Sequence, residues 1–172
     1  MHRQQIPVIA LTLGDAAGIG PELIARLLGQ PGITDGANIV LVGDPWLWQD
    51  GQAIAGLSVP TQAVVSLQEV RSRVDQRLPA FLAVDTIQPG QVQRSQALAA
   101  CGAAVLKVLD LCMDGAKRGE VDAICFAPLN KHAMKQGDHQ HEAELHHFAQ
   151  YLGVTGYFDV PAGYYRATVC AP

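Results

Sequence analysis

Two residues with chemical reach, Asn130 and Lys131, follow a short apolar run at residues 121–127. The run does not alternate with polar residues, which predicts a buried strand of a parallel sheet, covered on both faces. Pro128 lacks a backbone N–H and ends the strand. We therefore expect Asn130 and Lys131 at the carboxyl edge of the sheet, where ligands bind in such folds. There Asn130 offers an amide, and Lys131 offers a cation that can bind a carboxylate or a phosphate. The alternative is that Lys131 only opens a surface helix.

A glycine-rich turn into a helix follows the first predicted strand, residues 6–13, and contains Gly14, Asp15, Gly18, Gly20 and Glu22. The glycine spacing matches neither the dinucleotide-binding fingerprint nor the Walker pattern. The two carboxylates also make this helix start a poorer site for another anion. The turn is either a functional element near an active cleft or a device for tight turning and close packing. If Gly18 or Gly20 needs a positive φ, its replacement by alanine should cost about 1 kcal/mol or more.

Strands and helices alternate along the rest of the chain. Asp44 is predicted as an N-cap, and Ser66 with Glu69 forms a capping-box pattern. The predicted strands are residues 37–42, 59–65 and 81–84, and the predicted helices are residues 45–55, 66–78 and 94–118, the last ended by Gly119. The alternation predicts an α/β fold of the layered α/β/α kind.

Five of the six histidines fall between His132 and His147. A zinc-protease helix needs two histidines four residues apart, about 40° apart on the helix, but His141 and His146 are five apart, about 140°. The zinc-protease interpretation fails on this geometry. His141 and Glu144, near the start of a helix predicted at residues 142–152, are better candidates for contact with substrate, whereas His146 and His147 are predicted on the helix surface.

Composition narrows the possible partners. The net charge of −4 gives no electrostatic footprint for nucleic acid or an anionic membrane. The four cysteines show no C-x-x-C spacing, which disfavours a disulfide framework or a cysteine zinc site. With no signal peptide and no long apolar stretch in the sequence, we expect a cytoplasmic protein that acts on small molecules.

Three segments, in this order and at these distances, resemble the 4-hydroxythreonine-4-phosphate dehydrogenase family of pyridoxal phosphate biosynthesis. They are the turn at residues 14–22, Gln-Pro-Gly at residues 88–90 before a long helix, and residues 122–131 ending in Asn-Lys. The resemblance covers essentially all of residues 1–172 and is to the N-terminal half of the family's chains. It implies part of a two-domain fold related to the isocitrate and isopropylmalate dehydrogenases, with a domain crossover near residues 128–140.

The resemblance also implies a function. Family members oxidise and then decarboxylate 4-hydroxythreonine 4-phosphate or a related hydroxy acid, using NAD or NADP and a divalent metal (Zn, Mg or Co), and are usually homodimers. His141, Asn130, Lys131 and Glu144 are then the substrate-binding candidates, although the family's threonine next to the histidine is missing here.

Three metal-binding histidines of the family have no counterpart in residues 1–172. Pro172 takes the place of the first, or that histidine would fall just past residue 172, and the other two belong to the other half. The catalytic residues are likewise unassigned. We expect a truncated form that has no dehydrogenase activity alone and is completed by a C-terminal half. The alternative is a non-catalytic α/β domain that binds a small molecule or a partner.

Overall fold

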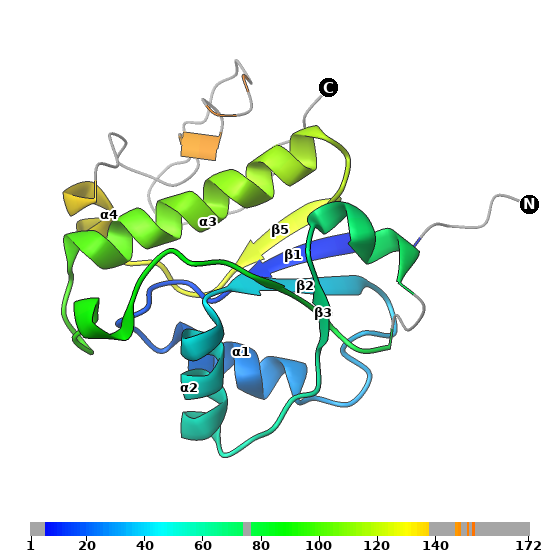
Figure 1. Ribbon diagram of the computed structural model, residues 1–172, viewed down its shortest axis with the longest axis horizontal. Coiled ribbons are helices and arrows are strands. Elements are labelled where there is room, and N and C mark those ends of the chain that lie inside the picture. The colour runs from blue at the N-terminus through cyan, green and yellow to red at the C-terminus, as the bar shows by residue number, and fades with distance from the viewer. Residues whose placement is uncertain (1–5, 74–76, 138–146, 149–150, 152, 154–172) are drawn as a thin grey trace, which may run out of the picture.

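The computed structural model describes residues 6–73, 77–137, 147–148, 151 and 153. Its five strands form one parallel sheet in the order β3-β4-β2-β1-β5 (Figure 1). The strands are β1 (Val8–Thr12), β2 (Asn38–Gly43), β3 (Gln62–Val64), β4 (Ala80–Ala83) and β5 (Ala123–Phe126). The helices are α1 (Gly20–Leu28), α2 (Pro45–Ala55), α3 (Ala99–Lys117) and α4 (Lys131–Gln136), with 3-10 helices η1 (Leu67–Ser72) and η2 (Pro89–Gln91).

The helices cover the two faces of the sheet, with α1 and α2 together on one side and α3 and α4 on the other (Figure 1). Strand β1 shows how the sequence supports both layers: Leu11 packs in the cluster with α1 and α2, while Val8 and Ala10 pack in a second cluster with α3. Strand β2 is buried at every position. The predicted layered α/β/α class is confirmed.

Strand β5 departs from the prediction. It was expected to be covered on both faces, but it ends the described sheet, and Ala123, Cys125 and Phe126 are exposed. The apolar content of a strand predicts that something packs on it, but it does not fix the position of the strand in the sheet order. The prediction of a fully covered strand is therefore wrong for the described part of the chain.

Helix α3 begins at Ala99, five residues after its predicted start. Ser95 has a φ of 62°, which a continuous helix does not allow, and its N–H donates to the carbonyl of Ala17 at 2.9 Å. The predicted end is confirmed, because Gly119 follows the C-cap Arg118 with a φ of 70°.

Among the described residues of the helix predicted at residues 66–78, only the 3-10 helix η1 is helical. The Ser66 side chain makes no capping bond, and the Glu69 carboxylate instead accepts the N–H of Val65 at 3.0 Å. After Ser72 the backbone of Arg73 is extended, and its guanidinium donates to the carbonyl of Leu78 at 2.7 Å. The capping-box pattern correctly marks a helical start, but it does not set the length of the helix.

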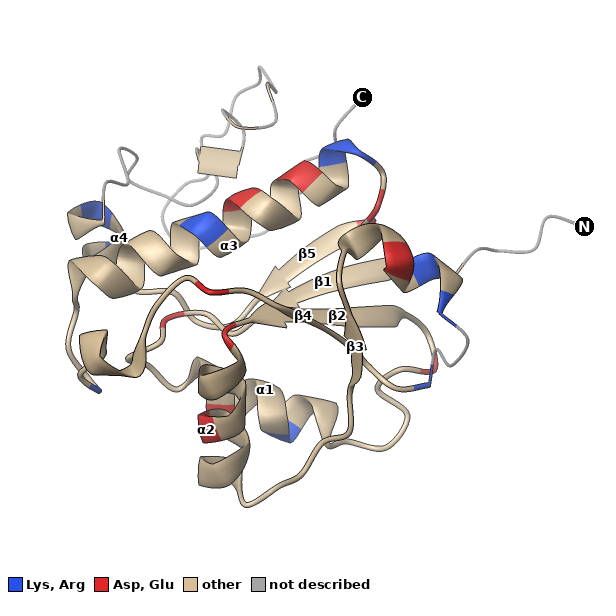
Figure 2. Cartoon of the chain, viewed as in Figure 1, with Lys and Arg blue, Asp and Glu red and all other residues tan. Residues whose placement is uncertain are grey.

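Helix α3 carries charged side chains of both signs, with Asp110 and Asp114 lying between Lys107 and Lys117 (Figure 2). No helix among the described residues is long and apolar enough to cross a membrane.

Candidate functional site

The sheet changes its winding direction between β1 and β5. These neighbouring parallel strands lead into α1 and α4, which lie on opposite faces of the sheet (Figure 1). In open parallel sheets, ligands bind at such a point, beyond the carboxyl ends of the strands. The N–H of Asp15 donates to the carbonyl of Pro128 at 3.1 Å, so the glycine-rich turn and the segment before Lys131 meet there.

Gly14 is the glycine that the meeting of these two turns requires. Its φ is 73°, and a Cβ at this position would lie 2.6 Å from the carbonyl oxygen of Pro128. A residue with a side chain would be strained by the backbone angle and would also push the two turns apart.

Neither Gly18 nor Gly20 has a positive φ, so the condition set for these two glycines is not met. Gly20 is needed for close packing instead: a Cβ would overlap the carbonyl oxygen of Leu13 and approach the Cβ of Ala127 to 3.1 Å. Gly18 is less constrained, since its nearest neighbour would be the carbonyl oxygen of Asp15 at 3.4 Å.

Asp15 uses the turn's own hydrogen-bond donors. Its buried carboxylate accepts the N–H of Ala17 at 3.0 Å, and its carbonyl accepts the N–H of Gly18 at 3.0 Å. These amides are therefore engaged within the turn rather than directed at a ligand. Together with Glu22 in the first turn of α1, this arrangement does not fit a cradle for the pyrophosphate of a dinucleotide.

Asn130 and Lys131 lie at the carboxyl edge, as predicted. Asn130 is the N-cap of α4, and its Oδ1 accepts the N–H of Ala133 at 3.1 Å, which leaves the amide NH₂ group directed elsewhere. Lys131 is the first residue of α4 and is exposed. At this position its ammonium can contact an anion that approaches the edge of the sheet. The position agrees equally well with the alternative, in which Lys131 only opens a surface helix.

Other predicted site residues are placed differently or lie outside the described part of the chain. Glu22 pairs with Arg26 one turn along α1, at 2.9 Å, on the surface. His141 and Glu144 lie outside the described residues, as does His146. His147, predicted on a helix surface, is half-buried, and its Nε2 lies 2.8 Å from a carboxylate oxygen of Asp110 on α3.

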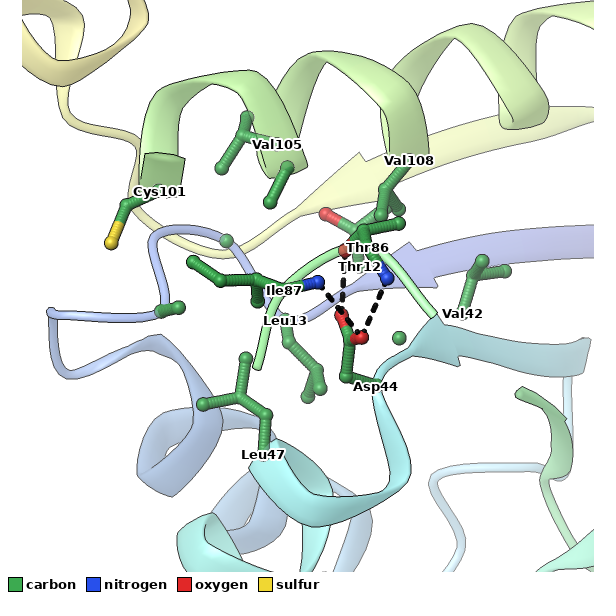
Figure 3. A pocket seen from close by; sticks show the side chains of 14 residues that line it. Thr12, Leu13, Val42, Asp44, Leu47, Thr86, Ile87, Cys101, Val105 and Val108 are labelled. Atoms are coloured by element: carbon green, nitrogen blue, oxygen red, sulfur yellow. Dashed lines mark hydrogen bonds between the residues drawn. The ribbon is translucent and has the colours of Figure 1, made fainter. Parts of the chain in front are cut away.

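A small cavity lies at the carboxyl ends of β1 and β2, between the sheet and the start of α3 (Figure 3). Its volume of about 20 Å³ has room for one water molecule, not for a substrate. The buried carboxylate of Asp44 forms one side and accepts the N–H and Oγ1–H of Thr86 at 2.8 and 2.6 Å and the N–H of Ile87 at 3.2 Å (Figure 3).

Asp44 was predicted as the N-cap of α2. It occupies that position, but its side chain caps no helix amide. The carboxylate instead accepts the three hydrogen bonds from Thr86 and Ile87, which follow β4. Asp44 thereby attaches the segment after β4 to the end of β2. Nothing in the local sequence signals this role, because Thr86 is 42 residues away.

Cys101 also lines the cavity and was not singled out by sequence reasoning. Its thiol is fully buried at the start of α3. Burial, and secondly the nearby carboxylate of Asp15, raise the pKa of the Cys101 thiol, so the group is neutral at physiological pH.

A second, wider groove of about 280 Å³ lies beside the glycine-rich turn. It is lined by Ala16, Trp46, Asp50, Pro89, Val92 and Arg94. Trp46 is held in place because its indole N–H donates to the carbonyl of Ile87 at 2.8 Å, and Arg94 forms an ion pair with Asp50. The groove therefore offers an aromatic ring and charges of both signs.

No group of three His, Cys, Asp or Glu side chains within the described part of the chain is arranged to hold a metal ion. No step through a metal or a nicotinamide cofactor is attributed to these residues.

The parallel sheet, the winding change and the paired turns define an α/β protein with a candidate ligand edge between β1 and β5. Residues 35–162 match the family described as pyridoxal phosphate biosynthetic protein PdxA. The chain belongs to this family.

Curated relatives carry dehydrogenase names. A protein of Pasteurella multocida, provisionally named 4-hydroxythreonine-4-phosphate dehydrogenase, is 39% identical over 142 residues, which are 83% of this chain and 42% of that protein. A protein of Oceanobacillus iheyensis, provisionally named D-threonate 4-phosphate dehydrogenase, is 29% identical over 136 residues, which are 78% of this chain and 40% of that protein. The chain thus spans less than half the length of these relatives.

A solved structure has the same fold. The crystal structure of a 4-hydroxythreonine-4-phosphate dehydrogenase from Burkholderia phymatum superposes with a TM-score of 0.76 at 26% identity, over 88% of this chain and 45% of that one. The predicted resemblance to the N-terminal half of this family is confirmed.

Proposed function

We propose that this chain provides the substrate-binding edge of a cytoplasmic dehydrogenase that oxidises and decarboxylates 4-hydroxythreonine 4-phosphate or a related hydroxy acid with NAD or NADP and a divalent metal. The observation that carries the proposal is the hydrogen bond between Asp15 and Pro128. It joins, at the point where the winding changes, the two segments that most resemble the family.

In this proposal Lys131 binds the negative charge of the substrate. Its ammonium is an exposed cation at the carboxyl edge, and both the carboxylate and the phosphate of such a substrate are anions. Asn130 contributes the free NH₂ of its amide, because its Oδ1 is already occupied by α4. His141 and Glu144 remain candidate substrate contacts on the strength of the family resemblance, just after the proposed domain crossover near residues 128–140.

The glycine-rich turn has a positioning role. Gly14, Asp15, Gly18 and Gly20 hold β1, α1 and the segment before Lys131 together, and Glu22 supports the start of α1 through its pair with Arg26. Since this turn does not fit a dinucleotide, we propose that cofactor and metal are bound chiefly by polypeptide other than the described residues. A homodimer or a complementing second half would provide it.

The test is a titration of ¹⁵N-labelled chain with 4-hydroxythreonine 4-phosphate, followed by NMR. The proposal predicts that the largest amide shifts occur at residues 14–20 and 129–133. The same titration with inorganic phosphate shows whether the phosphate group alone suffices. Shifts confined to other parts of the chain, or none at millimolar ligand, would refute it.

The expectation that residues 1–172 alone do not turn over the substrate stays a prediction. It is tested by incubating the purified chain with NAD, a divalent metal and 4-hydroxythreonine 4-phosphate or the unphosphorylated acid and following NADH. Metal-dependent NADH formation would show that this chain suffices for the reaction.

The second candidate function is a non-catalytic domain that binds a small molecule. The groove at Trp46 favours it, because an aromatic ring beside Arg94 and Asp50 suits a planar polar ligand. In the NMR titration, shifts centred on Trp46 and Arg94 rather than on Lys131 would favour this second function.

A further inference from the structure

The groove beside the glycine-rich turn lies between two walls. Trp46 and Asp50 line one wall, and they lie on the same side of α2 because they are four residues apart in the helix. The other wall is formed by residues 89–94, which comprise η2 and the residues that follow it as far as Arg94. The ion pair between Arg94 and Asp50 joins the two walls.

Hydrogen bonds to the surrounding chain hold both walls in place. The indole N–H of Trp46 donates to the carbonyl of Ile87 at 2.8 Å, which fixes the ring. On the other wall, the N–H of Ser95, next to Arg94, donates to the carbonyl of Ala17 at 2.9 Å. A preformed site loses less conformational freedom when a ligand binds. The groove is thus formed by the fold without the help of a ligand.

The charged groups of the groove favour an uncharged ligand. Arg94 is the one cation and Asp50 the one anion among the residues that line the groove, so their charges cancel. Their ion pair joins one terminal guanidinium nitrogen to Oδ2 of the carboxylate. A guanidinium has several N–H donors and a carboxylate has two acceptor oxygens, so the pair keeps hydrogen-bonding capacity for a ligand. A ligand with a donor next to an acceptor can bind both groups at once.

The volume of the groove limits the ligand to one flat ring system. It measures about 280 Å³, just below the range of about 300–1,000 Å³ that is typical of sites for drug-sized ligands. This is room for a single nucleobase but not for a whole dinucleotide.

We propose that the groove binds the adenine base of an uncharged nucleoside, such as adenosine. The base stacks on Trp46, its amino group donates to the carboxylate of Asp50, and the adjacent ring nitrogen accepts from the guanidinium of Arg94. Adenine presents a donor beside an acceptor in this way, and aromatic side chains are general platforms for stacked bases.

Other bases and phosphorylated forms fit the groove less well. Hypoxanthine, the base of inosine, has a carbonyl oxygen in place of the amino group, and that oxygen would face the carboxylate of Asp50. Cytosine has a donor and an acceptor in the same order, but its single ring offers less surface for stacking on Trp46. A phosphate would add negative charge, and the lining residues have no positive charge beyond the one that Asp50 neutralises.

This proposal gives a ligand class to the second candidate function and rests on the same groove. It does not depend on the substrate-binding edge at Lys131, which is assigned from other residues. The two sites can therefore be addressed separately, with adenosine for the groove and 4-hydroxythreonine 4-phosphate for the edge.

The test is a titration of ¹⁵N-labelled chain with adenosine, followed by NMR. The chain has two tryptophans. Trp46 lines the groove, whereas Trp48 is only 4% exposed, so their indole N–H signals serve as probe and internal reference. We expect the Trp46 signal and the amides of residues 90–94 to shift while the Trp48 signal stays in place.

Two further ligands test how the base is recognised. Inosine should bind at least about tenfold more weakly than adenosine, because a site that accepts a hydrogen bond from its ligand rejects an analogue that cannot donate one. AMP should bind no more tightly than adenosine, because the only cation among the lining residues is already paired.

Variants of the ion pair are compared with a matched pair at the end of α3. Arg94→Met should weaken adenosine binding at least about tenfold, because it removes a charged donor. Arg118→Met should leave binding unchanged, although Arg118 pairs with Glu120 and is 55% exposed, against 53% for Arg94.

Asp50→Asn keeps the shape of the side chain and should change the preference between ligands. An amide can donate to the carbonyl of inosine as well as accept from the amino group of adenosine, so the two affinities should come within about threefold of each other. Such a change in preference cannot result from a general loss of folding, and it decides the matter if Arg94→Met lowers the melting temperature.

Five results would overturn the proposal. The first three are an unmoved Trp46 signal at millimolar adenosine, equal binding of inosine and adenosine by the unchanged chain, and unchanged affinity of Arg94→Met. The fourth is clearly tighter binding of AMP, which would assign the groove to a nucleotide. The fifth is a shift of the Trp46 signal with 4-hydroxythreonine 4-phosphate but not with adenosine, which would leave the second candidate function in place without this ligand class.

Discussion

At the scale of single residues, Gly14 combines two constraints that can be separated. Its φ is positive, and a Cβ would also approach Pro128 to 2.6 Å. Gly56 has a similar φ of 66° but open space around it, so it carries the backbone constraint alone.

We predict that Gly14→Ala lowers the free energy of unfolding by more than about 1 kcal/mol, and by more than Gly56→Ala does. Gly18→Ala should cost less than either, because its φ is not in the left-handed region. Urea denaturation of the three variants measures this. Equal losses for Gly14→Ala and Gly56→Ala would show that contact with Pro128 contributes nothing.

The Asp44 carboxylate joins the segment after β4 to the end of β2. The variant Asp44→Ala leaves three donors at Thr86 and Ile87 without their buried acceptor. We expect a loss of about 3 kcal/mol, because hydrogen bonds to a charged group are worth about 1.5 to 3 kcal/mol each and are not additive. The exposed Asp85 is the matched control, and Asp85→Ala should change stability by less than about 0.5 kcal/mol. Comparable melting temperatures for both variants would contradict this role of Asp44.

At the scale of elements, Asp122 connects three parts of the chain just before β5. One carboxylate oxygen accepts the N–H of Val8 at 2.7 Å, and the other lies 2.8 Å from a guanidinium nitrogen of Arg71 on η1. The hydrogen bond from Arg71 is the largest cause that holds the pKa of Asp122 below its ordinary value of 3.8. The pair thus links the start of β1, η1 and the entry to β5.

This link should weaken in acid. Because the folded-state pKa is lowered, the contribution of Asp122 to stability is fully present above the unfolded-state pKa and is lost as the pH falls through the folded-state pKa. Arg71→Gln should therefore destabilise the protein more at pH 6 than at pH 3, by a modest amount because the pair is partly exposed. In an Asp122→Asn background this pH dependence should be much smaller, and an undiminished pH dependence would assign it to other groups.

The elements also show how far sequence reasoning extends. Local patterns correctly predict the helix that starts at Pro45 and the end of α3 at Gly119, because a fixed backbone angle acts within a few residues. The partners of Asp44 and the exposure of β5 could not be predicted, because both depend on segments distant in sequence. The same reason explains why Gly14, and not Gly18 or Gly20, has the positive φ: the contact with Pro128 is made by a segment more than a hundred residues away.

At the scale of the whole molecule, the apolar run before Pro128 and the glycine-rich turn predicted where a ligand edge would form, and the fold brings the two segments together. The substrate contacts themselves are not readable from the backbone. Asn130 and Lys131 serve equally well as the start of a helix and as a site for an anion. Only a binding measurement separates these two roles.

The most direct test of the account is a calorimetric titration of 4-hydroxythreonine 4-phosphate into the chain and into two variants. Lys131→Met removes the cation at the proposed ligand edge, and Lys107→Met removes an exposed cation from the middle of α3. We predict that Lys131→Met weakens binding at least about tenfold, equivalent to about 1.4 kcal/mol. Lys107→Met should keep the melting temperature and the affinity of the unchanged chain. Equal affinity of the two variants, or no binding by the unchanged chain, would contradict the assignment of this edge as the substrate site.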